Sequence, residues 1–279
     1  MISFVIRTYN EIAYIPKLIE MLQIQKSQDS KEIIIVDSGS TDGTLEMLNK
    51  YDVEILNIKK EDFNYSYALN EGIKNSKGEI IAILSGHSIP TNENWLKKMT
   101  THFTDEKIAG VYCRQIPWLN ADPYECLRLA RTFDSKSRIF DAITGNDLMF
   151  SNAASCIRRS VWEQHPFMIL PAAEDREWAQ WAIKTYYKIV YDATAEVYHS
   201  HKEPCRKSAK RLIDIEKARD IHKNARRNLL LTLKQSMGLF IRDIKKAPLM
   251  DENYIKKAML LKDCAARSFW YAYDFNRKK

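Results

Sequence analysis

Hydrophobic residues in the first 110 positions form two alternating kinds of segment. Unbroken runs of β-branched and aliphatic residues, as at 32–38 and 79–86, are typical of strands buried on both faces of a sheet. Between them, apolar residues recur at helical spacing, as at 12–25 and 66–76. Strands separated by helices predict βαβ units, and therefore an α/β fold with a mainly parallel sheet.

The chain is less regular between residues 120 and 160. A strand that leads into a helix is expected there at 151–162. A helix follows at 174–186, and an extended segment that ends in two histidines follows at 188–201. The second half of the chain therefore adds further strands to the same predicted sheet.

Charge divides the chain near residue 200. Residues 201–279 hold 21 Lys and Arg against 9 Asp and Glu, whereas residues 1–200 hold 22 against 27. We predict an α/β domain at 1–205 and a basic helical extension at 206–279. Its apolar-faced segment 224–246 suits an anionic membrane surface, although packing on the main domain or in a homodimer explains it equally well. No nucleic-acid-binding motif accompanies the charge, so nucleic acid is not an expected partner.

Composition is that of a globular protein outside the membrane. The 279 residues are 45% hydrophobic and 28% charged, and no run reaches the roughly 18 apolar residues of a membrane span. No signal peptide is evident at the start. The five cysteines are scattered without a CxxC motif, which indicates reduced thiols. These features predict a cytoplasmic protein, with peripheral attachment to the inner face of the membrane left open.

The stretch VDSGSTDGT at 36–44 is the most informative one. It places Asp37 at the end of a buried strand, followed by a small, glycine-containing turn. Ligands of open α/β sheets bind at the carboxyl ends of strands, and a carboxylate there can accept hydrogen bonds from a ribose or a base. A nucleotide site is therefore predicted at Asp37. An acid that merely caps the next helix is the alternative.

The first strand ends in a second group of polar residues, Arg7, Thr8, Tyr9 and Glu11. If the strand stays extended, alternate residues share one face, so Arg7, Tyr9 and Glu11 could stack on a base and contact its ribose. The alternative is structural, with Asn10 capping a helix.

Asn70 lies one helix before the strand at 79–86. Its amide offers a donor and an acceptor for the edge of a base, although a structural role is equally compatible with the sequence.

Other nucleotide-binding classes lack their motifs here. A dinucleotide-dependent dehydrogenase needs G-x-G-x-x-G after the first strand, where this chain has RTYNEI. A P-loop kinase needs GxxxxGK[ST], which is also missing. Both classes are disfavoured.

Four segments together resemble family 2 glycosyltransferases of the GT-A fold, which is Rossmann-like. They are the strand end TYNE, the block VDSGSTDGT, the segment 68–96 and the later AEDREWA, and their order matches over roughly residues 1–201. The resemblance implies an inverting transferase that moves a sugar from a nucleotide diphosphate to a hydroxyl of a glycan or lipid-diphosphate-linked acceptor, as in capsule or O-antigen assembly. It also implies that Asp37 contacts the nucleoside and that Tyr9 and Glu11 line the same pocket.

The chain departs from this family at its metal site. The family's Asp-x-Asp, which holds Mg²⁺ or Mn²⁺ against the diphosphate, is replaced by Ser85, Gly86 and His87. Either His87 joins His199 and His201 in binding a divalent cation, or histidine meets the diphosphate directly and the enzyme needs no metal. A catalytically inactive scaffold that binds nucleotide sugars is the alternative function.

The acid pair Glu174 and Asp175 opens the predicted helix at 174–186. The helix dipole favours carboxylates there, so simple charge complementarity explains them as well. An inverting transfer needs one base, and the resemblance gives that role to Asp175. We expect the helix start to lower the pKa of this acid. Glu174 is assigned to the acceptor side.

Further candidates come from the resemblance alone. Gln115 would line the sugar pocket, and Asn152 would lie on the acceptor side. The neighbouring Arg158 and Arg159 would offset phosphate charge or lie on the surface.

Overall fold

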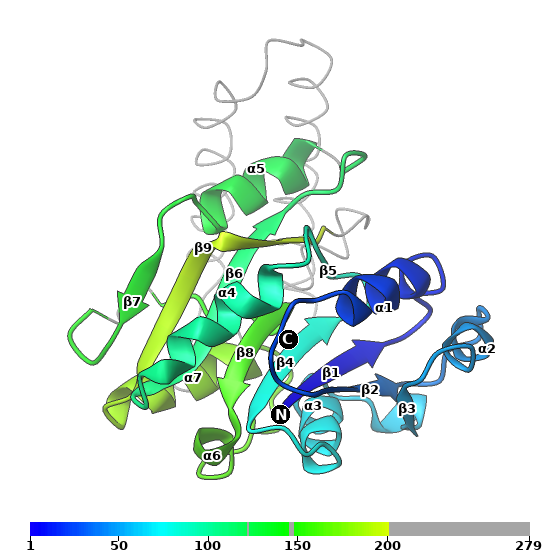
Figure 1. Ribbon diagram of the computed structural model, residues 1–279, viewed down its shortest axis with the longest axis horizontal. Helices are drawn as coiled ribbons and strands as arrows, with labels where there is room; N and C mark the ends of the chain where they lie inside the picture. The colour runs from blue at the N-terminus through cyan, green and yellow to red at the C-terminus, as the bar shows by residue number, and fades with distance from the viewer. Residues whose placement is uncertain (122, 145–147, 201–279) are drawn as a thin grey trace, which may run out of the picture. The chain divides into compact units, whose positions relative to one another are not determined.

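The computed structural model describes residues 1–121, 123–144 and 148–200, and its strands and helices alternate as the pattern predicts (Figure 1). The described chain forms two compact units. The first holds residues 1–116, 133–170 and 174–199, and the second holds residues 117–132 and 171–173 together with Ser200. The boundary predicted at residue 205 lies outside the described residues and stays a prediction.

One sheet carries all the described strands. Their bounds are β1 Ile2–Thr8, β2 Lys31–Asp37, β3 Glu54–Asn57, β4 Ile80–Ser85, β5 Ile89–Pro90, β6 Ile108–Ile116, β7 Arg138–Phe140, β8 Ala154–Arg158 and β9 Lys188–Tyr198. The order across the sheet is β3-β2-β1-β4-β8-β6-β9-β5, and β7 pairs with β9. Strands β3, β2, β1 and β4 are parallel neighbours. Strand β8 is antiparallel to both β4 and β6, so β6 and its parallel partner β9 share the direction of β4. The sheet is therefore mixed but mostly parallel, close to the prediction.

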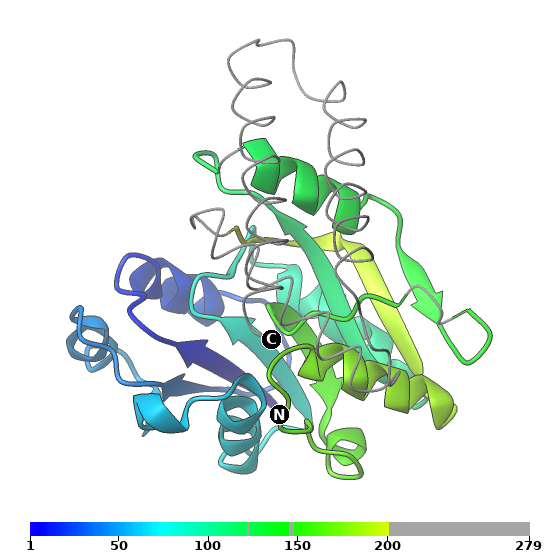
Figure 2. The same ribbon diagram turned by 180° about the vertical axis from the view of Figure 1, so that it is seen from behind.

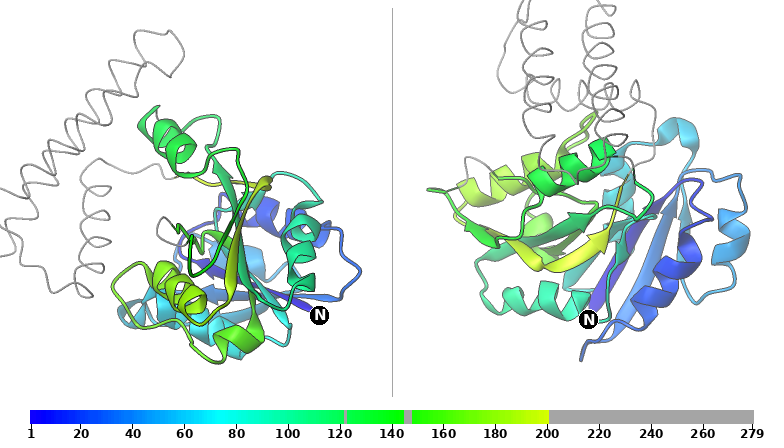
Figure 3. Two further views of the ribbon diagram at one scale, coloured as in Figure 1. Left: turned by 90° about the vertical axis from the view of Figure 1, so that its left-hand side faces the viewer. Right: turned by 90° about the horizontal axis from the view of Figure 1, so that it is seen from above.

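Helices cover both faces of this sheet. In the first unit they are α1 Ile15–Gln23, α2 Thr44–Leu48, α3 Tyr65–Lys74, α4 Trp95–Thr101, α6 Arg159–Trp162 and α7 Glu174–Lys184, with short 3₁₀ turns at Lys60–Asp62 and His102–Thr104. Helices α1 and α4 lie in front of the sheet in Figure 1, whereas α3 and α7 come to the front in the reverse view of Figure 2. Edge-on views separate the two layers (Figure 3).

Two glycines allow helices to pack closely on the sheet. A Cβ on Gly72 of α3 would lie 2.5 Å from a methyl of Val5 and 2.9 Å from one of Val36. A Cβ on Gly110 of β6 would lie 3.0 Å from the ring of Phe150 and 3.1 Å from that of Trp178. These glycines let α3 and α7 pack closely on the same face of the sheet (Figure 2).

The second unit contains a helix that the sequence pattern did not predict. Helix α5 spans Pro123–Thr132, and the short strands β5 and β7 of the first unit were also not predicted. The remaining predicted helices and strands up to residue 200 are present, with ends that differ by a few residues. Helix α1 begins at Ile15 instead of Ile12, because a proline occupies its first turn.

Candidate active site

The carboxyl ends of β1, β2 and β4 lie side by side and carry most of the predicted site residues. Thr8 at the end of β1 pairs with Asp37 at the end of β2, and Arg7 pairs with Ser85 at the end of β4. The N–H of Gly86 donates to the carbonyl of Arg7 at 2.8 Å. Since open α/β sheets bind ligands at this edge, the arrangement has the place expected of a nucleotide site.

Asp37 organises the turn that follows β2. Its Oδ1 accepts hydrogen bonds from the N–H groups of Gly39 at 2.9 Å and Ser40 at 2.8 Å, and its Oδ2 accepts one from the Ser40 hydroxyl at 2.5 Å. Asp37 does not cap α2, since that helix starts at Thr44, whose N–H donates to Asp42 instead. Asp37 is 0% exposed. Its contact with a nucleoside stays a prediction.

Asn10 joins the turn after β1 to the turn after β2. Its side-chain oxygen accepts a hydrogen bond from the N–H of Thr41 at 2.8 Å, and its own N–H donates to the Ser40 hydroxyl at 2.8 Å. The residue before α1 is Tyr14, which makes no side-chain cap. The alternative in which Asn10 caps a helix is therefore wrong.

The prediction that Arg7, Tyr9 and Glu11 share one face is also wrong. Strand β1 ends at Thr8, and Asn10 adopts a left-handed φ of 55°, so the chain turns before the alternation can continue. Tyr9 is 39% exposed, with the Lys60 ammonium 5.0 Å from its ring centroid. Arg7 turns toward the acid pair and Glu11 toward a pair of histidines, both described below.

Two histidines form a polar chain with Glu11 and Gln115, which we call the imidazole cluster. His87 Nδ1 lies 2.7 Å from Glu11 Oε1, and the His87 ring stacks on His199 at a centroid distance of 4.9 Å. His199 Nδ1 lies 2.8 Å from Gln115 Oε1, and Gln115 Nε2 donates to the Ser151 hydroxyl at 2.9 Å. Because carboxylate and amide oxygens are acceptors, Nδ1 is the donor in both contacts. Gln115 is buried, so its visible role is to orient His199.

A shift in strand pairing explains how His199 reaches this position. Between β6 and β9, Cys113 pairs with Asp192 but Arg114 pairs with Glu196, so β9 carries extra residues at this point. The N–H of His199 then donates to the carbonyl of Ile116 at 2.9 Å. This irregularity sets the His199 ring beside Gln115.

The described residues do not complete the divalent cation site predicted with His87, His199 and His201. The two rings are stacked with an interplanar angle of 13°, and the nearby carboxylate of Glu11 is bonded to His87. Among the described residues, no group of three or more His, Cys, Asp or Glu side chains is arranged to hold a metal ion. His201, the third predicted ligand, lies outside those residues.

Glu174 and Asp175 begin α7 at the carboxyl edge of the sheet and form the acid pair. Asp175 Oδ2 accepts a hydrogen bond from the N–H of Asn152 at 3.2 Å, and Oδ1 accepts one from the N–H of Arg176 at 2.8 Å. Glu174 Oε1 lies 3.7 Å from Nη1 of Arg7. Glu174 is 5% exposed, whereas Asp175 is more open to solvent. Two neighbouring carboxylates therefore face one guanidinium from β1.

The pKa values of this pair are raised. Burial raises the pKa of Glu174 to about 7, the negative charge of Asp175 contributes to that rise, and Arg7 opposes it. Burial also raises the pKa of Asp175, against Arg176 and the N–H groups that donate to it. The expected lowering of this pKa is therefore wrong, because desolvation outweighs the two arginines and the N–H groups that favour the ionised form.

Segment 151–153 connects the two clusters. Ser151 accepts the hydrogen bond from the imidazole cluster, Asn152 donates its N–H to Asp175, and the carbonyl of residue 153 accepts the N–H of Ser85 at 3.1 Å. The acid pair and the imidazole cluster thus meet at the end of β4, although their residues are far apart in the sequence.

Asn70 is bonded away from this edge. Its Nδ2 donates to the carbonyl of Phe167 at 2.8 Å, and its Oδ1 accepts from the Phe167 N–H and the Trp162 indole, each at 3.1 Å. These bonds tie α3 to the segment after α6, which matches the structural alternative. We therefore leave Asn70 out of the proposed donor site.

Arg158 and Arg159 lie at the opposite edge of the sheet, where Arg158 pairs with Ile80 at the start of β4. Arg158 donates to the carbonyls of residues 103, 105 and 108, and Arg159 donates to those of residues 73, 76 and 78. Both arginines hold the backbone together there and do not offset phosphate charge at the site.

Sequence reasoning missed Tyr65, whose ring lies under the Arg7 guanidinium at 5.0 Å. The side chain of Asn64 accepts the N–H groups of Ser66 and Tyr67 and thereby caps α3, which fixes Tyr65 as its first residue. An Asn followed by a helical pattern was the available signal.

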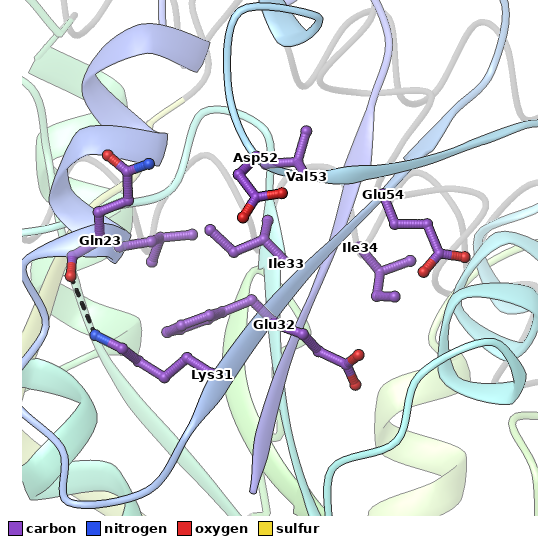
Figure 4. Close-up of a pocket in the computed structure, with 10 residues that line it drawn as sticks. Gln23, Lys31, Glu32, Ile33, Ile34, Asp52, Val53 and Glu54 are labelled. Carbon is purple, nitrogen blue, oxygen red and sulfur yellow. Dashed lines mark hydrogen bonds between the residues drawn. The ribbon is translucent and has the colours of Figure 1, made fainter.

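A cavity of about 390 Å³ lies elsewhere, at the amino end of β2. Figure 4 shows Lys31, Asp52 and Glu54 around it, with the Lys31 ammonium bonded to the carbonyl of Gln23 at 3.1 Å. Because substrates of such sheets bind at the carboxyl edge, this cavity is not the candidate active site.

Two further predictions concern compartment and membrane. Cys113, Cys126 and Cys156 are free thiols. In the part of the chain that the structure describes, no helix combines the length and apolar character needed to cross a membrane. The interfacial helix predicted at 224–246 lies outside that part, so the membrane and homodimer contacts stay predictions.

A mixed, mostly parallel sheet with an acidic helix start at its carboxyl edge defines a GT-A-like fold, and solved structures share it. The mannosyltransferase PcManGT from Pyrobaculum calidifontis, solved with GDP-Man and Mn²⁺, matches with a TM-score of 0.65 at 17% identity over 99% of this chain and 86% of that one. Residues 1–349 of TarS from S. aureus, solved with UDP-GlcNAc, match with a TM-score of 0.58 at 15% identity over 100% and 92% of the two chains.

Comparison with related sequences identifies the protein family. Residues 3–165, more than half of the chain, match the family described as Glycosyl transferase family 2. The O-antigen chain rhamnosyltransferase WbaN of Salmonella anatum is 30% identical, and RfbN of Salmonella typhimurium is 29% identical, each over 76% of this chain and 70% of the relative. The chain belongs to glycosyl transferase family 2, which confirms the predicted family and glycosyltransferase activity.

Proposed function

We propose that this protein transfers rhamnose, with inversion, from a nucleotide diphosphate to a hydroxyl of a growing O-antigen-type glycan. Two relatives similar over 76% of the chain are named O-antigen chain rhamnosyltransferases. Thymidine diphosphate-rhamnose is the donor that we expect, with UDP-hexoses as the competing class. The acceptor would be a glycan carried on a lipid diphosphate, used at the cytoplasmic face of the membrane.

The observation that carries the inverting mechanism is the acid pair at the carboxyl edge. In the proposed reaction, an oxygen of Asp175 takes the proton of the acceptor hydroxyl as the hydroxyl oxygen bonds to the anomeric carbon. The bond from that carbon to the diphosphate breaks at the same time, and the nucleoside diphosphate leaves. One base is enough because no covalent intermediate forms. Asp175 suits this role because it is more open to solvent than Glu174 and its raised pKa makes it a stronger base.

The donor half of the site is proposed at the ends of β1 and β2. The exposed ring of Tyr9 offers a stacking surface for the base, and Thr8 carries a buried hydroxyl that has no hydrogen-bond partner among the described residues. Asp37 would act by holding the turn beside them. An unsatisfied buried hydroxyl is costly in an empty site and is relieved when a ligand supplies a partner.

The imidazole cluster is proposed to contact the diphosphate. It lies at the end of β4, where the family's metal-binding acids are replaced, and Glu11 and Gln115 hold the two rings in place. The steps of the proposed reaction are written with side chains of this chain only.

A donor panel tests the proposal. The purified full-length protein is incubated with thymidine diphosphate-rhamnose, UDP-glucose, UDP-GlcNAc or GDP-mannose and with a synthetic lipid-diphosphate-linked glycan. We expect rhamnosyl transfer to exceed hexosyl transfer by more than tenfold in kcat/KM. Product analysis by NMR should show the anomeric configuration opposite to that of the donor.

Three outcomes would count against this function. A UDP-hexose as preferred donor would refute the rhamnose assignment but keep the transferase, whereas retained configuration would refute the single-base mechanism. If no donor supports transfer or slow hydrolysis while nucleotides still bind, the inactive scaffold is the better description.

A further inference from the structure

Arg7 occupies an unusual position for a charged side chain. It extends from the end of β1 with only 12% of its side chain exposed, and its guanidinium carbon lies 5.0 Å above the ring of Tyr65. Its Nη1 lies 3.7 Å from Glu174 Oε1, which is longer than a hydrogen bond. Among the described residues, Nε and Nη1 of Arg7 have no hydrogen-bond partner although they are buried.

A guanidinium buried in this way is costly unless it serves another charge. The acid pair is that charge. Glu174 and Asp175 are consecutive in the first turn of α7, so each carboxylate raises the cost of ionising the other. In the described chain, the cations that act on the pair are Arg7 from β1 and Arg176 from α7 itself. Tyr65 from α3 lies under the Arg7 guanidinium, and Asn152 before β8 donates its N–H to Asp175.

The two cations do not act alike. Arg176 contributes to the ionisation of Asp175, whereas Arg7 acts on both carboxylates. Arg7 also comes from a different part of the fold, so it couples the strand that ends at the donor side to the helix that carries the base. Stacking on Tyr65 fixes its plane without using any of its N–H groups.

We propose that Arg7 is a positioning residue for the acid pair, which holds Glu174 in place and keeps the pair ionised so that Asp175 can accept a proton. This assignment rests on the proposed function, in which Asp175 is the base. It replaces the sequence-based expectation that Arg7 contacts the nucleotide. The opposing effect of Arg7 on both pKa values agrees with this role.

The test is the pH dependence of kcat/KM for Arg7→Met and Arg7→Lys. An opposite charge at this distance lowers a carboxylate pKa by about one unit or more. Arg7→Met should therefore move the acid limb of the pH profile, which is the range where activity rises with pH, upward by about one pH unit. Activity at pH 6 should then fall about tenfold further than activity at pH 9.5, because the pair ionises without help at high pH. Arg7→Lys keeps the charge and should lie between the wild type and Arg7→Met.

Arg158→Met is the matched control. It removes another partly buried arginine, one that bonds to backbone carbonyls at the opposite edge of the sheet. It should lower Tm without moving the acid limb. A merely structural role for Arg7 would give the same result in Arg7→Met, and that result would overturn the proposal.

Two further outcomes separate this proposal from the proposed function. If Arg7→Met raises the donor Kd more than tenfold at all pH values and leaves the acid limb in place, Arg7 binds the donor and the positioning role is wrong. If Asp175→Asn keeps wild-type turnover, the base assignment itself fails, whatever Arg7 does. If Arg7→Met does not fold, Arg7→Gln decides, because it also removes the charge, and an unshifted acid limb in Arg7→Gln counts against the proposal.

Discussion

Asp37 and the acid pair lie at the same edge of one sheet but in opposite electrostatic environments. Asp37 is fully buried, yet its two oxygens accept three hydrogen bonds from Gly39 and Ser40. Glu174 is almost as buried but faces a second carboxylate and a guanidinium beyond hydrogen-bond distance. One carboxylate is satisfied by its own turn, and the other is left with a pKa raised to about 7.

This difference separates two uses of acid in the same fold. The N–H groups of Gly39 and Ser40 donate to Asp37, which thereby holds the turn rigid. The acid pair lacks enough such donors, so it is costly to ionise and correspondingly ready to take a proton. A buried carboxylate with few hydrogen-bond donors is therefore the better candidate for a catalytic group.

The largest expected effect comes from Asp175→Asn. Loss of the proposed base should lower kcat by about 10²–10⁴-fold, because general-base catalysis contributes that much. The donor Kd should stay near its wild-type value, since the lost interaction belongs to the transition state. Calorimetric titration with nucleotide and a steady-state transfer assay separate the two quantities.

Asp105→Asn is the control for this substitution. Asp105 pairs with Lys188 at the opposite edge of the sheet and is exposed to solvent. It should leave kcat unchanged. A kcat for Asp175→Asn within threefold of the wild type would show that another residue is the base. Asp175 and Asp37 would then no longer differ in function.

The second prediction concerns the pH dependence of stability and Glu174→Gln. The folded-state pKa of Glu174, about 7, lies above its ordinary value of 4.5, so the folded protein binds more protons than the unfolded chain between these pH values. The free energy of unfolding should therefore fall as pH rises from 4.5 to 7, by up to about 3 kcal/mol from this group. Glu174→Gln should remove most of that fall and leave the part due to Asp175.

Urea unfolding at a series of pH values measures this slope. Glu71→Gln removes a partly exposed carboxylate that pairs with Lys74 and should leave the slope as in the wild type. An unchanged slope in Glu174→Gln would mean that Glu174 does not bind an extra proton in the folded state.

Much of the fold follows from the sequence because its strands are buried on both faces. Runs such as 33–36 and 80–84 have no polar residue that could belong to a helix surface, so their type and order are clear from hydrophobicity alone. Helix α5 and the short strands β5 and β7 lack such runs, so hydrophobicity alone did not reveal them.

The candidate site could be predicted in its residues but not in its geometry. The blocks that contain Asp37, His87 and Asp175 mark the edge of the sheet correctly. The left-handed φ of Asn10 ends the alternation of β1 and sends Arg7 and Glu11 to different clusters, which no local pattern shows. The raised pKa of the acid pair likewise depends on burial by distant segments.

Asp37→Ala gives the smallest expected effect and completes the comparison. It leaves the N–H groups of Gly39 and Ser40 and the Ser40 hydroxyl without their acceptor, so the free energy of unfolding should fall by about 2 kcal/mol. Because the turn shapes the donor side, the donor Kd should rise, while kcat at saturating donor stays within about threefold of the wild type. Asp42→Ala removes an acceptor from the start of α2 and should cost less stability, without a change in donor Kd. A fall in kcat like that of Asp175→Asn would show that Asp37 takes part in the chemical step. The number of hydrogen bonds that a carboxylate accepts would then no longer distinguish a structural acid from a catalytic one at this edge of the sheet.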